Sequence, residues 1–261
     1  MNTIYLEYKK EYDSYIIADE VINDFIKKNI VPNIRIKQET LPNSPTIGVL
    51  MGREKDCYAT HNEYVKTTLD AGANIKFLDY TNCLAQLEEC DGLLLIGGAF
   101  PTPKQYYNSN QSGFGFEYTQ RLCAYIALSI NAQTKKIPIL AICAGAQIIA
   151  MEKGLKIDLV DNHQTKELNV HKIKIASNSL LKKIINKEEI TVNSRHKEQV
   201  INNNTINIYA TSDDNVLEAW GDENNNILCV QWHPETMYVE NNDKEQLEIY
   251  KWLINKAKEL K

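Results

Sequence analysis

A cysteine and a histidine in this chain stand in contexts suited to acyl transfer. Cys143 directly follows the apolar run 137–142 and is itself followed by Ala144 and Gly145. This order matches the nucleophile elbow, G-x-nucleophile-x-G, with Ala141 in place of the first glycine. The elbow turns the side chain out of the strand, and the N-terminus of the next helix favours a thiolate. The pattern predicts a reactive thiol; the alternative is a cysteine buried as a small apolar residue.

His233 is the histidine best placed to act as a base. It follows the apolar run 228–232, and Glu235 lies two residues further on. In extended backbone, residues i and i+2 point to the same side, so the carboxylate can accept a hydrogen bond from the imidazole. Nucleophilic catalysis requires a base held by an orienting group. We therefore expect Cys143, His233 and Glu235 to form a catalytic triad.

Two backbone N–H groups are candidates for stabilising a tetrahedral oxyanion. One belongs to Ala144, directly after the nucleophile. The other belongs to Gly98, in a Gly-Gly pair that follows the apolar run 92–96. Glycine lets the backbone approach a ligand closely, because it has no Cβ.

Strands and helices alternate through the first half of the chain. Apolar runs at 46–51, 75–78, 92–96 and 137–142 read as buried strands, and helical patterns end at Gly72 and span 116–131. This alternation predicts an α/β fold with a mostly parallel central sheet and helices on both faces. Reactive groups in such a sheet lie beyond the carboxyl ends of the strands, where Cys143 is expected.

The second half has shorter β patterns, at 171–175, 190–192, 206–210, 216–219 and 227–231. A last amphipathic helix is expected over 243–260, with these apolar residues buried: Leu247, Tyr250, Leu253, Ile254 and Ala257.

Residues 1–44 are predicted to be an N-terminal helical extension, and residues 45–261 the catalytic domain. Apolar residues recur at helical spacing from Ile16 to Ile30, and prolines at 32, 42 and 45 interrupt the chain before the first strand. Three roles are open for this segment: packing onto the sheet, closing the site, or forming a contact in a homodimer.

Composition narrows the class of protein. The net charge is −5 over 261 residues, so a nucleic-acid partner is not expected. No apolar run is long enough to span a bilayer, and the N-terminus lacks the features of a signal peptide, so we expect no membrane partner. The six cysteines contain no Cys-x-x-Cys pair, which argues against a zinc site or a disulfide framework and favours the cytoplasm. We expect neither metal nor cofactor.

Several motifs, taken in order, resemble the class I glutamine amidotransferase superfamily and, within it, the γ-glutamyl hydrolase branch, peptidase family C26. The resemblance covers roughly residues 45–240. It rests on the glycine turn 91–98 with Pro103 and Tyr106, the elbow 138–147, His171 with Ser179-Leu180, Asn193-Ser194-Arg195-His196, Glu218-Ala219, and 231–235.

The resemblance implies a flavodoxin-like three-layer fold and a cysteine-dependent hydrolase of small γ-glutamyl compounds. It implies that these residues border the γ-glutamyl group: Gln147, Asn193, Ser194 and His196. Three positions depart from the branch: Phe100 stands where Asp is usual, Ala144 replaces a larger residue, and Glu198 falls where Gln is usual. An acidic Glu198 would repel an anionic leaving group, which favours a neutral or cationic amine.

Two rival functions stay open. The first is the glutaminase component of an amidotransferase, which delivers ammonia to a synthetase partner and predicts glutamine turnover that depends on that partner. The second is a non-catalytic binding or regulatory module on the same fold. It predicts that Cys143 is inert to thiol electrophiles at neutral pH.

Overall fold

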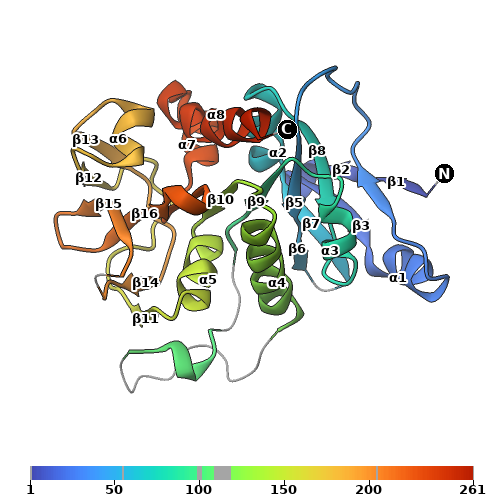
Figure 1. The fold of residues 1–261 in the computed structure, drawn as a ribbon, viewed down its shortest axis with the longest axis horizontal. Helices are drawn as coiled ribbons and strands as arrows, with labels where there is room; N and C mark the ends of the chain where they lie inside the picture. The colour runs from blue at the N-terminus through green and yellow to red at the C-terminus, as the bar shows by residue number, and fades with distance from the viewer. Residues whose placement is uncertain (1, 55, 99–101, 109–118, 204, 261) are drawn as a thin grey trace.

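The computed structural model describes residues 2–54, 56–98, 102–108, 119–203 and 205–260. An 11-stranded sheet runs through the middle of the molecule (Figure 1). Its central part is parallel, in the order β8 (Asn74–Leu78), β5 (Thr46–Leu50), β9 (Gly92–Leu95), β10 (Ile139–Ile142) and β17 (Ile227–Val230). The predicted mostly parallel central sheet is therefore confirmed.

Beyond β17 the sheet becomes antiparallel. It continues through β16 (Leu217–Asp222), β15 (Asn207–Ser212), β12 (His171–Ile175) and β13 (Glu189–Val192). A separate antiparallel pair, β11 (Lys156–Leu159) and β14 (Glu198–Ile201), lies next to this half. The short β patterns predicted between 171 and 231 are found as strands, whereas β11 and β14 have no counterpart among the predicted strands.

Helices cover both faces of the sheet (Figure 1). One face carries α3 (Cys83–Leu87), α4 (Gln120–Thr134) and α5 (Ala144–Glu152); the other carries α2 (Asn62–Asp70), α6 (Leu180–Ile185), α7 (Pro234–Asn241) and α8 (Lys244–Glu259). Short 3₁₀ turns occur at Lys10–Tyr12, Lys104–Tyr106 and Glu223–Asn225. The five apolar residues predicted to be buried in the last helix are all buried in α8.

The sheet separates two hydrophobic cores. Leu94 and Leu140 pack into the core beneath α2 and α8, whereas their neighbours Leu93 and Ile139 pack into the core beneath α4 and α5. Successive side chains of a strand point to opposite faces, so a strand that must fill two cores has to be apolar throughout. This explains why these strands are continuous apolar runs in the sequence.

The N-terminal segment differs from the predicted helical extension. It contains one helix, α1 (Asp19–Lys27), but also the strands β1 (Thr3–Tyr5), β2 (Glu7–Lys9), β3 (Ser14–Ala18) and β4 (Asn33–Arg35). β1 and β4 extend the edge of the central sheet, and β2 and β3 join β7 (Cys57–His61) and β6 (Gly52–Glu54) in a second sheet.

The helix predicted from Ile16 therefore begins only at Asp19. Ile16 and Ile17 lie in β3, paired with Ala59 and Tyr58 of β7, and this pairing with a distant strand outweighs the local helical spacing. The division of the chain at residue 44 stays a prediction.

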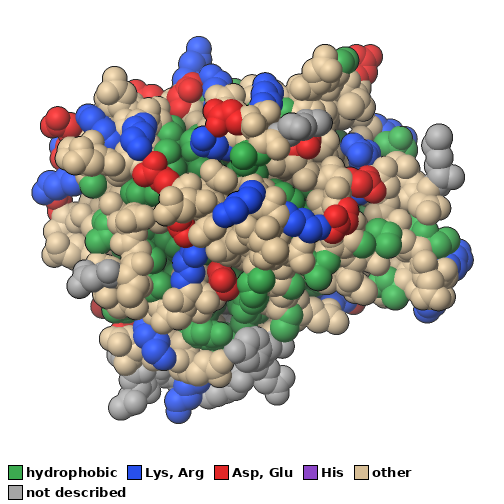
Figure 2. Space-filling view, in the orientation of Figure 1, with side chains coloured by type: hydrophobic (Ala, Val, Ile, Leu, Met, Phe, Trp, Pro, Cys, Tyr) green, Lys and Arg blue, Asp and Glu red, His purple; other side chains and the backbone are tan. Residues whose placement is uncertain are grey.

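The surface is mixed in charge. On the face in Figure 2, acidic and basic side chains are interspersed rather than gathered in one patch. Among the described residues, no helix combines the length and apolar character needed to cross a membrane. The absence of a nucleic-acid partner stays a prediction.

Candidate active site

Cys143 occupies a strained turn between β10 and α5. Its backbone has φ +50° and ψ −110°, a conformation that residues other than glycine rarely adopt, and its N–H donates to the Val230 carbonyl of β17 at 2.8 Å. Such strain persists only where the surroundings fix it, and it occurs mainly at functional sites. The thiol is nearly buried at the start of α5, where the helix dipole favours negative charge.

Gly145 explains why this turn can form. A Cβ at this position would lie 2.3 Å from the Leu95 carbonyl oxygen of β9, so any larger residue would push α5 away from the sheet. The glycine two positions after the nucleophile is thus required by packing against a strand about fifty positions earlier in the chain.

The imidazole of His233 lies between Glu235 and Cys143. Its Nδ1 is 2.6 Å from Oε1 of Glu235, which is fully buried, and the ring also hydrogen-bonds with the Cys143 thiol. With Nδ1 held by Glu235, Nε2 is the nitrogen left for the sulfur. Burial would lower the pKa of His233, but the charges of Glu235 and Cys143 outweigh burial and raise this pKa to about 10. The arrangement favours an imidazolium beside a thiolate.

Asn193 holds the backbone of His233 on both sides. Its Oδ1 accepts the His233 N–H at 2.8 Å, and its Nδ2 donates to the His233 carbonyl at 2.9 Å. Asn193 is completely buried. The side chain was predicted to border the substrate, but these contacts favour a role in positioning the histidine.

Tyr64 is a site residue that the sequence does not reveal. Its hydroxyl lies 3.3 Å from Nδ1 of His233 and accepts the Gly97 N–H at 3.0 Å. In the sequence Tyr64 looks like one of several apolar positions of a helix, and no local signal distinguishes it.

The glycine pair after β9 is shaped by its neighbours. Gly97 is squeezed among Tyr64, His233 and Cys143, and its carbonyl accepts a hydrogen bond from the buried Arg121 at 2.7 Å. Gly98 has φ +126°, which favours glycine. Because the Gly97 N–H already donates to Tyr64, Gly98 is the member of the pair whose N–H is suited to an oxyanion. The second predicted donor, the residue after the nucleophile, is the first residue of α5.

The other predicted substrate residues make contacts further along the sheet. Gln147 donates to the Glu198 carbonyl at 2.9 Å and to Oε1 of Gln231 at 3.2 Å. Ser194 donates to the His163 carbonyl at 2.7 Å. His196 lies 3.2 Å from His163, Nε2 to Nδ1. Ser194 and His196 are therefore joined to His163, which the sequence does not single out.

Glu198 is buried and its carboxylate accepts hydrogen bonds from two hydroxyls. One is that of Thr102, at 2.9 Å, and the other is that of Tyr107. The acidic side chain therefore ties the segment after the glycine turn to β14. Phe100, the other departure noted in this region, lies outside the described residues.

Comparison with known proteins points to one family. Residues 50–235 match the sequence model of the family described as Peptidase C26. A GMP synthase (glutamine-hydrolyzing) of Petrotoga mobilis is 29% identical over 176 residues, which cover 67% of this chain and only 30% of that protein. In Halobacterium salinarum the similar protein is a separate subunit of GMP synthase (glutamine-hydrolyzing). It is 28% identical over 182 residues, covering 69% of this chain and 85% of that subunit.

The fold has solved counterparts. A glutamine amidotransferase of Thermotoga maritima superposes with a TM-score of 0.59 at 16% identity, covering 83% of this chain and 99% of that one. At this identity the likeness shows the fold alone.

Proposed function

This chain belongs to the peptidase C26 family, and we propose that it is a cysteine-dependent hydrolase that cleaves the γ-glutamyl amide bond of small γ-glutamyl compounds. The observation that carries the proposal is the His233 ring, hydrogen-bonded to Glu235 at 2.6 Å and to the Cys143 thiol at the elbow. A thiolate beside an imidazolium is a nucleophile beside a general acid.

The reaction proceeds in two steps. In the first, the Cys143 thiolate attacks the γ-glutamyl carbonyl, and the N–H groups of Gly98 and Ala144 stabilise the oxyanion. His233 gives its Nε2 proton to the leaving amine, the C–N bond breaks, and a γ-glutamyl thioester remains. Glu235 keeps the Nδ1 proton in place throughout.

In the second step, the neutral His233 takes a proton from water, and the resulting hydroxide attacks the thioester. The C–S bond breaks, glutamate leaves with a new C–O bond, and the thiolate–imidazolium pair is restored. One water is consumed for each amide bond cleaved.

Glu198 supports a preference for the amine. Its buried carboxylate beside Thr102 and Tyr107 would oppose an anionic leaving group, so we expect neutral or cationic amines to be preferred. The variant Glu198→Gln should shift the ratio of kcat/KM for γ-glutamyl-putrescine over γ-glutamyl-γ-aminobutyrate toward the latter. An unchanged ratio would remove this part of the proposal.

The decisive experiment follows glutamate release from a panel of γ-glutamyl amines and from glutamine. We expect release from at least one γ-glutamyl amine, loss of activity in Cys143→Ala, and full activity in Cys123→Ala, which removes an exposed cysteine of α4. If all the amides stay intact while an electrophile fails to label Cys143, the protein is not this hydrolase and the hypothesis of a binding module takes its place.

A second candidate is the glutaminase component of an amidotransferase. It is favoured by the relatives named GMP synthase, of which the one from Halobacterium salinarum is a separate subunit matched over 85% of its length. The two candidates share the thioester chemistry and differ in the leaving group, which is ammonia for a glutaminase. Turnover of glutamine in preference to every γ-glutamyl amine, increased by a synthetase partner, would decide for the glutaminase.

A further inference from the structure

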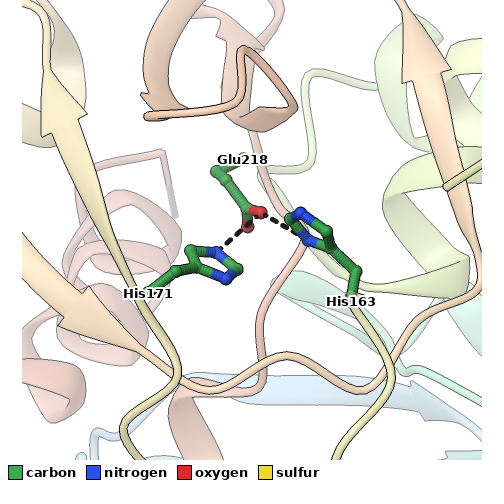
Figure 3. Close-up of side chains that lie close together, drawn as sticks. All are labelled: His163, His171 and Glu218. Atoms are coloured by element: carbon green, nitrogen blue, oxygen red, sulfur yellow. Dashed lines mark hydrogen bonds and ion pairs between the residues drawn. The ribbon is translucent and has the colours of Figure 1, made fainter. Parts of the chain in front are cut away.

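Three histidines and one glutamate converge in the antiparallel half of the sheet. Glu218 of β16 points toward His171 of β12 and toward His163 in the loop before β12 (Figure 3). His196, just before β14, completes the group. His163, His196 and Glu218 are buried, while the His171 side chain is 19% exposed. None of these side chains takes part in the proposed reaction.

Hydrogen bonds fix which nitrogens of two histidines carry protons. Nε2 of His163 lies 2.9 Å from the Asp214 carboxylate, and Nδ1 of His196 lies 2.9 Å from the Glu198 carbonyl oxygen. Both partners only accept hydrogen bonds, so both nitrogens are donors. In the neutral rings, the lone pairs of His163 Nδ1 and His196 Nε2 then face each other at 3.2 Å. Something positive must lie between them, either a proton or a metal ion.

The distances suit a metal ion. Oε1 of Glu218 lies 3.0 Å from His171 Nε2, 3.5 Å from His163 Nδ1 and 3.8 Å from His196 Nε2. With Zn–N and Zn–O bonds of about 2.0–2.1 Å, the edges of a coordination tetrahedron measure about 3.3 Å. The four donor–donor distances, including the 3.2 Å between His163 and His196, bracket that value. The donor atoms of His163, His171 and Glu218 all lie within 4.8 Å of one another.

We propose that His163, His171, His196 and Glu218 bind a divalent transition-metal ion, with Zn²⁺ the best match to this donor set. Imidazole and carboxylate ligands suit zinc, and four protein ligands leave no open position, which is typical of a structural site.

The surroundings of the ligands support this assignment. Histidines that bind metals usually donate their second N–H to a carboxylate or a backbone carbonyl, as His163 does to Asp214 and His196 does to Glu198. Oε2 of Glu218 is buried with no hydrogen-bond partner among the described residues. A buried carboxylate oxygen in this position is costly unless a cation lies near it.

The sequence-based expectation of no metal rested on the absence of a Cys-x-x-Cys pair. That argument concerns thiolate sites and does not apply to ligands that come together from four separate segments.

The site would stabilise the segment that positions the catalytic base. The His163 carbonyl accepts hydrogen bonds from Ser194 and from the His196 N–H, next to Asn193, which holds His233. The N–H of residue 231 donates to the Glu218 carbonyl at 2.7 Å, two residues before His233.

The test measures zinc binding by the full-length chain in a Cys143→Ala background, which removes the thiol as a competing ligand. Apo protein is titrated with Zn²⁺ against a chromophoric chelator, and bound metal is counted by mass spectrometry. Four variants are compared: His171→Gln, Glu218→Gln, Asp214→Asn and, as a matched control in β7 of the second sheet, His61→Gln.

We expect one zinc per chain, no stoichiometric binding in His171→Gln or Glu218→Gln, and unchanged binding in His61→Gln. Asp214→Asn keeps every ligand and should weaken binding about 10- to 100-fold. Asp214 is largely exposed, so this variant tests the site even if a ligand variant fails to fold. Co²⁺ should give the visible absorption of a tetrahedral site. Failure of the parent to bind zinc, or equal binding in His171→Gln and Asp214→Asn, would show that a shared proton, not a metal, joins the histidines.

Discussion

Replacing Gly97 by alanine should lower kcat/KM about 100-fold while the protein stays folded. The new Cβ would lie 2.7 Å from Cε1 of His233, 2.9 Å from the Tyr64 hydroxyl and 3.3 Å from Cβ of Cys143. Non-bonded carbon atoms are comfortable at about 3.5 Å, so the imidazole must move by about 0.8 Å. Misplacement of a catalytic group by about 1 Å costs about 100-fold, or about 2.7 kcal/mol of transition-state stabilisation.

The assay combines kcat/KM on a γ-glutamyl amide with the rate of Cys143 alkylation and the Tm. Gly52→Ala is the matched control, because its Cβ would meet only the Ala59 carbonyl, at 3.3 Å, and it lies in β6 of the second sheet. Tyr64→Phe tests whether crowding of the hydroxyl accounts for the effect. If Gly97→Ala stays within about twofold of the wild type in kcat/KM, with an unchanged Tm, the His233 ring is not held in the reacting position that we describe.

Three further perturbations test the same site. Asn193→Ala leaves the N–H and carbonyl of His233 without their partners, at about 1–3 kcal/mol for each buried group, so the Tm should fall and kcat should fall more than KM changes; unchanged kinetics would deny the positioning role. The His233 imidazolium is retained up to its pKa of about 10, so kcat/KM should decline as pH rises through about 10, and Glu235→Gln should move that decline to lower pH; an unmoved alkaline limb would contradict the charge argument. Burial first, and then the nearby carboxyl groups of α7, raise the pKa of Glu63 from 4.5 to about 7, so the folded protein retains a proton that the unfolded chain releases. Stability should therefore fall between pH 4.5 and 7, and Glu63→Gln should raise the Tm more at pH 8 than at pH 5; equal gains at both pH values would refute this.

The parallel half of the fold could be predicted because its signals are local. Strands that fill two cores read as continuous apolar runs, and Cys143 stands where one such run meets a helix. The pairing of His233 with Glu235 is also local, because only Pro234 separates them. The reason for Gly145, a contact with the Leu95 carbonyl, is visible only in three dimensions.

The parts that could not be predicted depend on contacts between distant segments. Ile16 and Ile17 have helical spacing, yet β7, some forty residues away, draws them into a strand. Asn193 belongs to a motif that suggested substrate binding, while its amide spans 40 positions to hold the backbone of His233. His163 has no distinguishing neighbours in the sequence and gains its partners only when the loop before β12 folds over β16.

The central claim is that Cys143 forms a covalent γ-glutamyl thioester, and mass spectrometry of acid-quenched protein tests it most directly. After brief mixing with a γ-glutamyl amide that the protein hydrolyses, we expect one added γ-glutamyl group per chain, mapped to the peptide that contains Cys143 and accumulating further in a His233→Asn variant slowed in deacylation. Hydrolysis that proceeds with Cys143 unmodified throughout, or an adduct on another cysteine, would contradict this account.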